Sequence, residues 1–169
     1  MHTQPSNYLK RVACAVITVS DTRDKDTDKS GKLIVEQLHA SNHQVNLYKI
    51  IPDETELIEQ TVAEAVHSKE IEAVILNGGT GISNRDVTIE SIQHLFDKEL
   101  PGFGELFRYL SYQQDIGTAS MLSRAASGVV NNRIVFALPG SAGAVTLAME
   151  KLILPELVHM VTEIKKDLT

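Results

Sequence analysis

The chain has 169 residues, of which 43% are hydrophobic and 22% are charged, and its formal net charge is -6 at pH 7. This charge argues against nucleic-acid binding through a broad basic face, because affinity for a phosphate backbone depends on clustered lysines and arginines. A single cysteine, and the absence of an apolar run of about 18 residues, favour a cytoplasmic protein over a secreted or membrane protein.

The chain begins with a polar stretch that is followed by an apolar one. Residues 1–10 are polar and contain Pro5, so we expect a flexible arm ahead of a single domain over residues 11–169. Residues 12–19 (VACAVITV) are apolar and β-branched without alternation, which predicts a strand covered on both faces, as in a parallel sheet. Cys14 within this run is expected to be a buried thiol.

A helix and a second strand are predicted next. After a turn-forming and charged segment, Ser30 or Gly31 is expected to open the helix, and residues 45–51 are expected to form the strand. Asp53 then has the character of an N-cap for another helix, and Glu56 three residues later completes an acidic variant of the capping box.

The third predicted strand leads into a glycine loop. Residues 73–76 (AVIL) are apolar, residues 77–81 read NGGTG, and Thr88 is expected to cap the following helix. Glycines let backbone N–H groups approach a ligand closely, and the positive end of a helix dipole stabilises an anion. The order strand, glycine loop, helix therefore predicts an anion-binding site, although such glycines can also serve only a tight turn.

Several better-known motifs do not fit the sequence. A P-loop needs Lys after its last glycine, but Ile82 follows Gly81, and a dinucleotide fingerprint needs glycine where Asn84 stands. A serine-hydrolase elbow needs glycine two residues before Ser141, where the chain has Pro139. The six histidines show no metal-ligand spacing, which argues against a zinc site.

The last third of the chain predicts helices around a strand pair. The apolar residues Phe103, Leu106, Phe107 and Leu110 are spaced as on one face of a helix. Such a face is typical of a packed amphipathic helix or of a subunit interface. Residues 127–138 predict two strands joined by a turn at Asn131 and Asn132, which adds one antiparallel strand to a mostly parallel sheet. A helical stretch over residues 142–166 is expected to kink or split at Pro155.

A second glycine-rich junction resembles the first in its chemistry. Residues 139–143 read PGSAG, Ser141 is expected to cap the helix that follows, and the junction presents backbone N–H groups at the carboxyl edge of the sheet. Two such junctions predict a ligand with several phosphate oxygens. Arg85 and Arg124 are candidate phosphate clamps, since a guanidinium binds phosphate oxygens in a bidentate manner.

Carboxylates recur where predicted strands end, at Asp21, Asp53 and Asp86. Carboxylates beside phosphates require a divalent cation, and Mg²⁺ suits the pattern because it is held by one or two carboxylates together with phosphate oxygens and water. Each of these side chains, taken alone, is equally compatible with a capping or surface role.

Seven short motifs occur together in this chain. They are VSDT at 19–22, DKSG at 28–31, PDE at 52–54, NGGTG with RDVT at 77–88, PGFGE at 101–105, SRA at 123–125 and ALPGS at 137–141. Their order and spacing over roughly residues 12–160 resemble the MoaB/MogA family of molybdenum cofactor biosynthesis proteins.

The resemblance implies a fold, an activity and a set of site residues. The fold would be a three-layer α/β/α sandwich with a mostly parallel sheet and one antiparallel strand, assembled into homotrimers or homohexamers. The activity would be Mg-ATP-dependent adenylylation of molybdopterin, with Asp53 and Asp86 as catalytic residues that hold Mg²⁺ and position the substrates. Other proteins of the same pathway are implied as partners. The residues expected to bind nucleotide and pterin phosphate are Ser20, Asp21, Gly78, Gly79, Thr80, Gly81, Arg85, Ser123, Pro139, Gly140 and Ser141.

Two positions depart from the family pattern and leave alternatives open. Asn77 stands where many active members have threonine, and Ala142 stands where proline is common. One alternative is a molybdopterin-binding assembly protein of the same pathway without turnover. Another is a flavodoxin-like mononucleotide binder, which would share the glycine loop but would not require the acidic residues.

Overall fold

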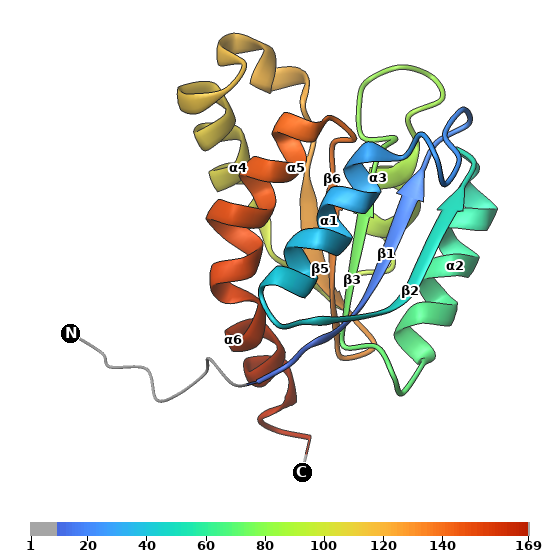
Figure 1. Cartoon of the computed structure of the whole chain (residues 1–169), viewed down its shortest axis with the longest axis vertical. Helices are drawn as coiled ribbons and strands as arrows, with labels where there is room; N and C mark the ends of the chain where they lie inside the picture. Colours follow the sequence, from blue (N-terminus) through green and yellow to red (C-terminus); the bar gives the residue numbers. More distant parts are fainter. Residues whose placement is uncertain (1–9, 169) are drawn as a thin grey trace.

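The structure, a computed structural model, describes residues 10–168, so the predicted N-terminal arm lies outside the described residues except for Lys10. A six-stranded sheet with the order β2-β1-β3-β6-β5-β4 forms the centre of the fold (Figure 1). Its strands are β1 (Ala13–Val19), β2 (Gln44–Ile51), β3 (Ala73–Asn77), β4 (Lys98–Glu99), β5 (Ala126–Val130) and β6 (Arg133–Leu138).

Helices cover both faces of the sheet and make three layers (Figure 1). One face packs against α1 (Lys29–Ala40), α4 (Pro101–Gln114), α5 (Ala142–Ala148) and α6 (Leu154–Lys165). The other face packs against α2 (Thr55–His67) and α3 (Thr88–Gln93). The predicted α/β/α sandwich is therefore confirmed. None of the helices in the described part of the chain is both long enough and apolar enough to cross a membrane.

Strand β1 illustrates why the central strands lack polar alternation. Cys14 and Val16 contribute to the core under α1 and α4, whereas Ile17 contributes to the core under α2 and α3, and all three are fully buried. A strand with helices on both faces must be apolar at every position. Burial raises the pKa of the Cys14 thiol to about 12, so this residue is the inert core thiol that the sequence predicted.

The antiparallel part of the sheet is the predicted hairpin. Strand β5 runs antiparallel to β6 and also to β4, while β1, β2, β3 and β6 are parallel. Asn131 and Asn132 both have positive φ angles, 46° and 59°, as a two-residue turn of the primed type requires. Strand β4 was not predicted, because its two residues are too few to show a pattern.

Three of the predicted helix starts are wrong. Helix α1 begins at Lys29 and is capped by Asp28, whose side chain accepts from the Gly31 N–H, so neither Ser30 nor Gly31 opens it. The N-cap of α2 is Glu54, without a side-chain bond, so Asp53 is not a cap.

Thr88 is likewise the first residue of α3 and not its cap, because its hydroxyl donates to the Gly78 carbonyl at 2.8 Å. Local spacing could not reveal this tertiary partner. In contrast, Ser141 caps α5 as predicted, since its hydroxyl accepts from the Ala144 N–H.

The C-terminal helical stretch is divided ahead of Pro155. A π-helical segment, η3 (Met149–Ile153), separates α5 from α6, and Pro155 lies in the first turn of α6. The predicted split is confirmed, but it falls a few residues earlier, because a widened turn before the proline relieves the clash of its ring with the preceding turn. In α4, Phe103 and Phe107 are buried as expected, whereas Leu106 is 54% exposed.

Candidate functional site

The parallel strands end at one edge of the sheet, and a cavity of about 350 Å³ lies there. Its lining comes from the end of β1, from the loops that follow β1, β2, β3 and β6, and from the end of η2 (Gly117–Leu122) with the residue after it. The lining residues are Val19, Ser20, Thr22, Arg23, Asp53, Gly78, Gly79, Thr80, Gly81, Asp86, Leu122, Ser123, Pro139 and Gly140. The structure thus brings together most of the binding residues expected from the sequence, including both acidic residues.

The two glycine junctions lie side by side at this edge. The Gly78 N–H donates to the Leu138 carbonyl at 2.9 Å, and a Cβ on Gly140 would lie 3.2 Å from the Gly78 Cα. This close approach explains why both junctions are built from small residues. Backbone groups of both junctions can therefore face one ligand.

Gly79 is constrained by its conformation and by its neighbours. Its φ angle is +65°, and an added Cβ would lie 2.4 Å from the Thr88 Oγ1 and 2.7 Å from the Asp53 Oδ1. Residues 82–87 separate the loop from α3, as the expected helix start near Thr88 implies, and the Thr88 N–H donates back to the Gly79 carbonyl. The first backbone N–H of α3 is thus hydrogen-bonded within the protein and is not available to a ligand.

Three carboxylates lie close to one another at the rim. The Asp21 carboxylate accepts the Asp53 backbone N–H at 3.0 Å and pairs with Arg85 at 2.9 Å, and these contacts lower the pKa of Asp21. Burial raises the pKa of Asp53, and the negative charges of Asp21 and Asp86 raise it further. A hydrogen bond with the Asp21 backbone opposes part of this rise in the pKa of Asp53, and Asp53 lines the cavity.

The oxygen donors at the site are of the kind that a magnesium ion takes when it shares its coordination with a ligand. Among the described residues there is no group of three or more side chains that could hold a metal alone. Asp53 and Asp86 both line the cavity, and the Ser83 N–H and hydroxyl hold one oxygen of Asp86 at 3.0 and 2.6 Å. Mg²⁺ keeps several waters and takes one or two carboxylates plus phosphate oxygens. Two carboxylates at the cavity are therefore enough, and a site built wholly from protein ligands is not required.

The two candidate phosphate clamps are engaged elsewhere. Arg124 donates to the carbonyls of Thr80 and Gly81 at 2.9 and 2.7 Å and pairs with Glu90. Arg85 is bound to Asp21, and neither arginine lines the cavity. Arg124 therefore supports the glycine loop from outside. Asp21 and Ser141, which were also expected at the site, lie next to the cavity without lining it.

Sequence reasoning missed one basic side chain of the site, Arg23. It lies in the turn after β1, where charged residues looked like an ordinary solvated loop. Its donation to the Gly140 carbonyl at 2.9 Å joins positions 117 residues apart in the chain, which local patterns do not reveal. The signal that could have revealed it was its place in the loop that follows β1.

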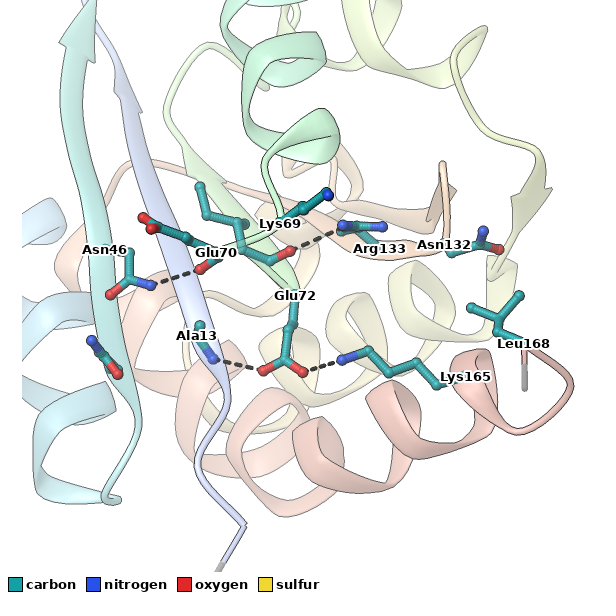
Figure 2. Close-up of a pocket in the computed structure, with 11 residues that line it drawn as sticks. Ala13, Asn46, Lys69, Glu70, Glu72, Asn132, Arg133, Lys165 and Leu168 are labelled. Carbon is teal, nitrogen blue, oxygen red and sulfur yellow. Dashed lines mark hydrogen bonds and ion pairs between the residues drawn. The ribbon is translucent and has the colours of Figure 1, made fainter.

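A larger cavity, of about 560 Å³, lies at the opposite edge of the sheet (Figure 2). Three of the charged residues that line it, Glu72, Arg133 and Lys165, have structural partners. Arg133 donates to the carbonyl of Ile71 at 3.0 Å, while Glu72 accepts the Ala13 N–H and pairs with Lys165 (Figure 2). We assign the site to the smaller cavity because two carboxylates from loops after parallel strands and both glycine junctions line it together.

The fold and the site together define a class of protein. The class is a three-layer α/β protein with a glycine-lined, acidic cavity at the carboxyl edge of its sheet. The family described as "Probable molybdopterin binding domain" matches residues 15–159, and this chain belongs to that family.

Individual relatives agree with this assignment. Molybdenum cofactor biosynthesis protein B of Bacillus subtilis (strain 168) is 56% identical over 156 residues, which cover 92% of each chain. A crystal structure of a molybdenum cofactor biosynthesis protein B superposes with a TM-score of 0.92 at 51% identity, covering 94% of this chain and 98% of the other. The tungsten cofactor synthesizing protein MoaB from Pyrococcus furiosus gives a TM-score of 0.81 at 42% identity, covering 91% and 97%. The family expected from the sequence motifs is confirmed.

Proposed function

We propose that this protein acts in molybdenum cofactor biosynthesis as a molybdopterin adenylyltransferase. The observation that carries the proposal is that two glycine junctions and two carboxylates, Asp53 and Asp86, line a single cavity. Membership of a molybdopterin-binding family supports the pterin substrate, and the names of the relatives support the pathway. The substrates would be molybdopterin and Mg-ATP.

The reaction requires alignment and charge neutralisation more than a strong base. An oxygen of the terminal phosphate of molybdopterin attacks the α-phosphorus of ATP, a new P–O bond forms, and the bond to pyrophosphate breaks. The attacking oxygen is already anionic, so no proton has to be removed. Backbone N–H groups of residues 79–81 would hold phosphate oxygens, and Asp53 and Asp86 would hold Mg²⁺. When bound, the cation would offset the negative charge that develops on the leaving pyrophosphate.

The departures from the family pattern lie behind the cavity. The Asn77 side chain is fully buried, accepts from the Ser30 hydroxyl at 2.9 Å and donates to the Thr18 hydroxyl at 2.9 Å. Neither Asn77 nor Ala142 lines the cavity. These substitutions therefore leave the ligand-facing groups in place, which favours a catalytically active protein over one that only binds pterin.

An AMP-transfer assay tests the proposal. The protein is incubated with molybdopterin and Mg-ATP, and adenylylated molybdopterin is measured by mass spectrometry. Asp53→Asn and Asp86→Asn should each lower turnover by about a hundredfold or more, since each removes charge that acts in the transition state. Calorimetry should show molybdopterin affinity within about threefold of the wild type, because backbone groups provide that binding. Absence of product from the wild type, or undiminished turnover in both variants, would overturn the proposal.

We further propose that the protein is a homo-oligomer that associates through α4 and η2 (Gly117–Leu122). Exposed apolar side chains gather on these two elements and on the turn between them, namely Leu106, Tyr109, Tyr112, Ile116, Met121 and Leu122. Apolar surface of this kind is commonly covered by a partner, and the family resemblance points to a second copy. Met121, at 76% exposed, is the most accessible of the group. Met121→Asp should shift the mass measured by light scattering toward the monomer, and an unchanged mass would contradict this interface.

A further inference from the structure

One basic side chain faces the candidate site. Among the described residues that line the cavity, Arg23 is the one with a positively charged side chain, and that side chain is 31% exposed. Asp53 and Asp86 contribute negative charge to the same lining. In this cavity, the side chain of Arg23 therefore supplies the positive charge that attracts a phosphate group.

The guanidinium of Arg23 is fixed at the point where the two junctions meet. Its Nη2 donates to the Gly140 carbonyl at 2.9 Å, and its Nη1 donates to the Ser30 hydroxyl at 2.5 Å. Both nitrogens lie 3.5 Å from the place that a Gly140 Cβ would occupy, and that place is 3.2 Å from the Gly78 Cα. The arginine side chain has about five N–H donors, and two of them make the bonds recorded within the described chain. The other donors are available to a ligand.

A buried polar network holds this guanidinium from behind. The Asp28 Oδ1 lies 3.6 Å from the Arg23 Nη1, and the Asp28 side chain is fully buried. Asp28 also accepts the Thr18 hydroxyl at 2.6 Å, the Tyr48 hydroxyl at 2.5 Å and the Gly31 N–H at 3.0 Å. A cation held in this way loses little conformational entropy when an anion binds.

We propose that Arg23 binds a phosphate group of the ligand, a role that sequence reasoning had given to Arg85 and Arg124. The inference rests on the proposed function, because it concerns the same cavity. The phosphate belongs either to the pterin or to the nucleotide. Both have the same recognition chemistry, a planar guanidinium that donates to phosphate oxygens while neighbouring backbone N–H groups complete the contact.

Ligand affinities of matched variants test this role. Arg23→Gln removes the charge, Arg23→Lys keeps it without the planar fork, and Arg11→Gln removes an equal charge from an exposed residue whose recorded partner is Asn42. Calorimetry is done separately with molybdopterin, Mg-ATP and inorganic pyrophosphate. Arg23→Gln should weaken at least one of these ligands by about ten- to a hundredfold, Arg23→Lys by less, and Arg11→Gln should match the wild type. The ligand that loses affinity identifies the source of the phosphate.

Protection from chemical modification provides a second test that needs no variant. Phenylglyoxal modifies exposed arginines, and mass spectrometry reports the extent at each site. The same three ligands should protect Arg23 and leave Arg85, whose side chain is 59% exposed, reactive. If Arg23 has a purely structural role, the ligands will not protect it from modification. In that case Arg23→Gln will also have a lower melting temperature and unchanged ligand affinities, and these results together would overturn the inference.

The failure of this inference can be told apart from the failure of the proposed function. If the wild type transfers AMP while Arg23→Gln binds every ligand equally well and Arg23 is unprotected, the role of Arg23 is refuted and the function stands. If the wild type binds neither molybdopterin nor ATP, the proposed function itself fails.

Discussion

Gly79→Ala is the substitution whose effect follows most directly from the geometry of the site. The φ angle of +65° would place alanine in the left-handed region, which costs about 1–2 kcal/mol. The new Cβ would also lie 2.4 Å from the Thr88 Oγ1, so the hydrogen bond from this hydroxyl to Gly78 would be lost, at about 1 kcal/mol. The expected loss of unfolding free energy is about 2–3 kcal/mol, or about 4–12 °C in melting temperature for a chain of this size.

Turnover should fall as well, because the same Cβ would lie 2.7 Å from the Asp53 Oδ1. A displacement of this carboxylate by a fraction of an ångström should lower AMP transfer by about tenfold. Gly117→Ala is the matched control, since Gly117 has a φ angle of +60° and an added Cβ would meet nothing within 4 Å.

The control variant should lose only the backbone contribution, about 1–2 kcal/mol, and should retain AMP transfer. Thermal melting and the AMP-transfer assay, run on both variants, separate the strain of the backbone from the contacts of the side chain. Equal melting temperatures and equal turnover in Gly79→Ala and Gly117→Ala would refute the proposed contact of Gly79 with Asp53.

Two further predictions concern stability. Ser141→Ala removes the cap of α5 and should lower the free energy of unfolding by about 1 kcal/mol in urea denaturation, and an unchanged midpoint would contradict the capping bond. Burial raises the pKa of Glu72, but the contacts with Lys165 and the Ala13 N–H outweigh it and lower the pKa below 4.5. Above pH 4.5, the wild type should therefore have a free energy of unfolding about 2 kcal/mol higher than Glu72→Gln. This difference should vanish as the pH falls through the lowered pKa. A difference that is the same at pH 3 and pH 7 would contradict this ion pair.

The layers of the fold were predictable because they depend on local patterns. Unbroken apolar runs predict strands buried on both faces, and the adjacent pair Asn131 and Asn132 predicts a tight hairpin. The rim could be predicted too, since residues that follow parallel strands must meet at one edge. Asp53 and Asp86 were placed there by their positions after β2 and β3, and the structure brings them to one cavity.

The partners of charged side chains could not be predicted in the same way. Arg85 binds Asp21 across 64 positions and Arg124 contacts Glu90 across 34, and such pairings depend on how loops pack after the sheet has formed. For the same reason, the sequence suggested a capping role for Asp53, whereas the structure leaves its carboxylate facing the cavity. The sequence around Arg23 indicated only an exposed loop, whereas the structure shows that Arg23 contacts Gly140 of the second junction.

A crystal structure of the protein with molybdopterin and a non-hydrolysable ATP analogue is the most direct test of where the ligands bind. We predict phosphate density against the backbone of residues 78–81 and residues 139–141, with a cation next to Asp53 and Asp86. Phosphate density confined to the cavity of Figure 2, with both glycine junctions free of ligand, would contradict the assignment of the site.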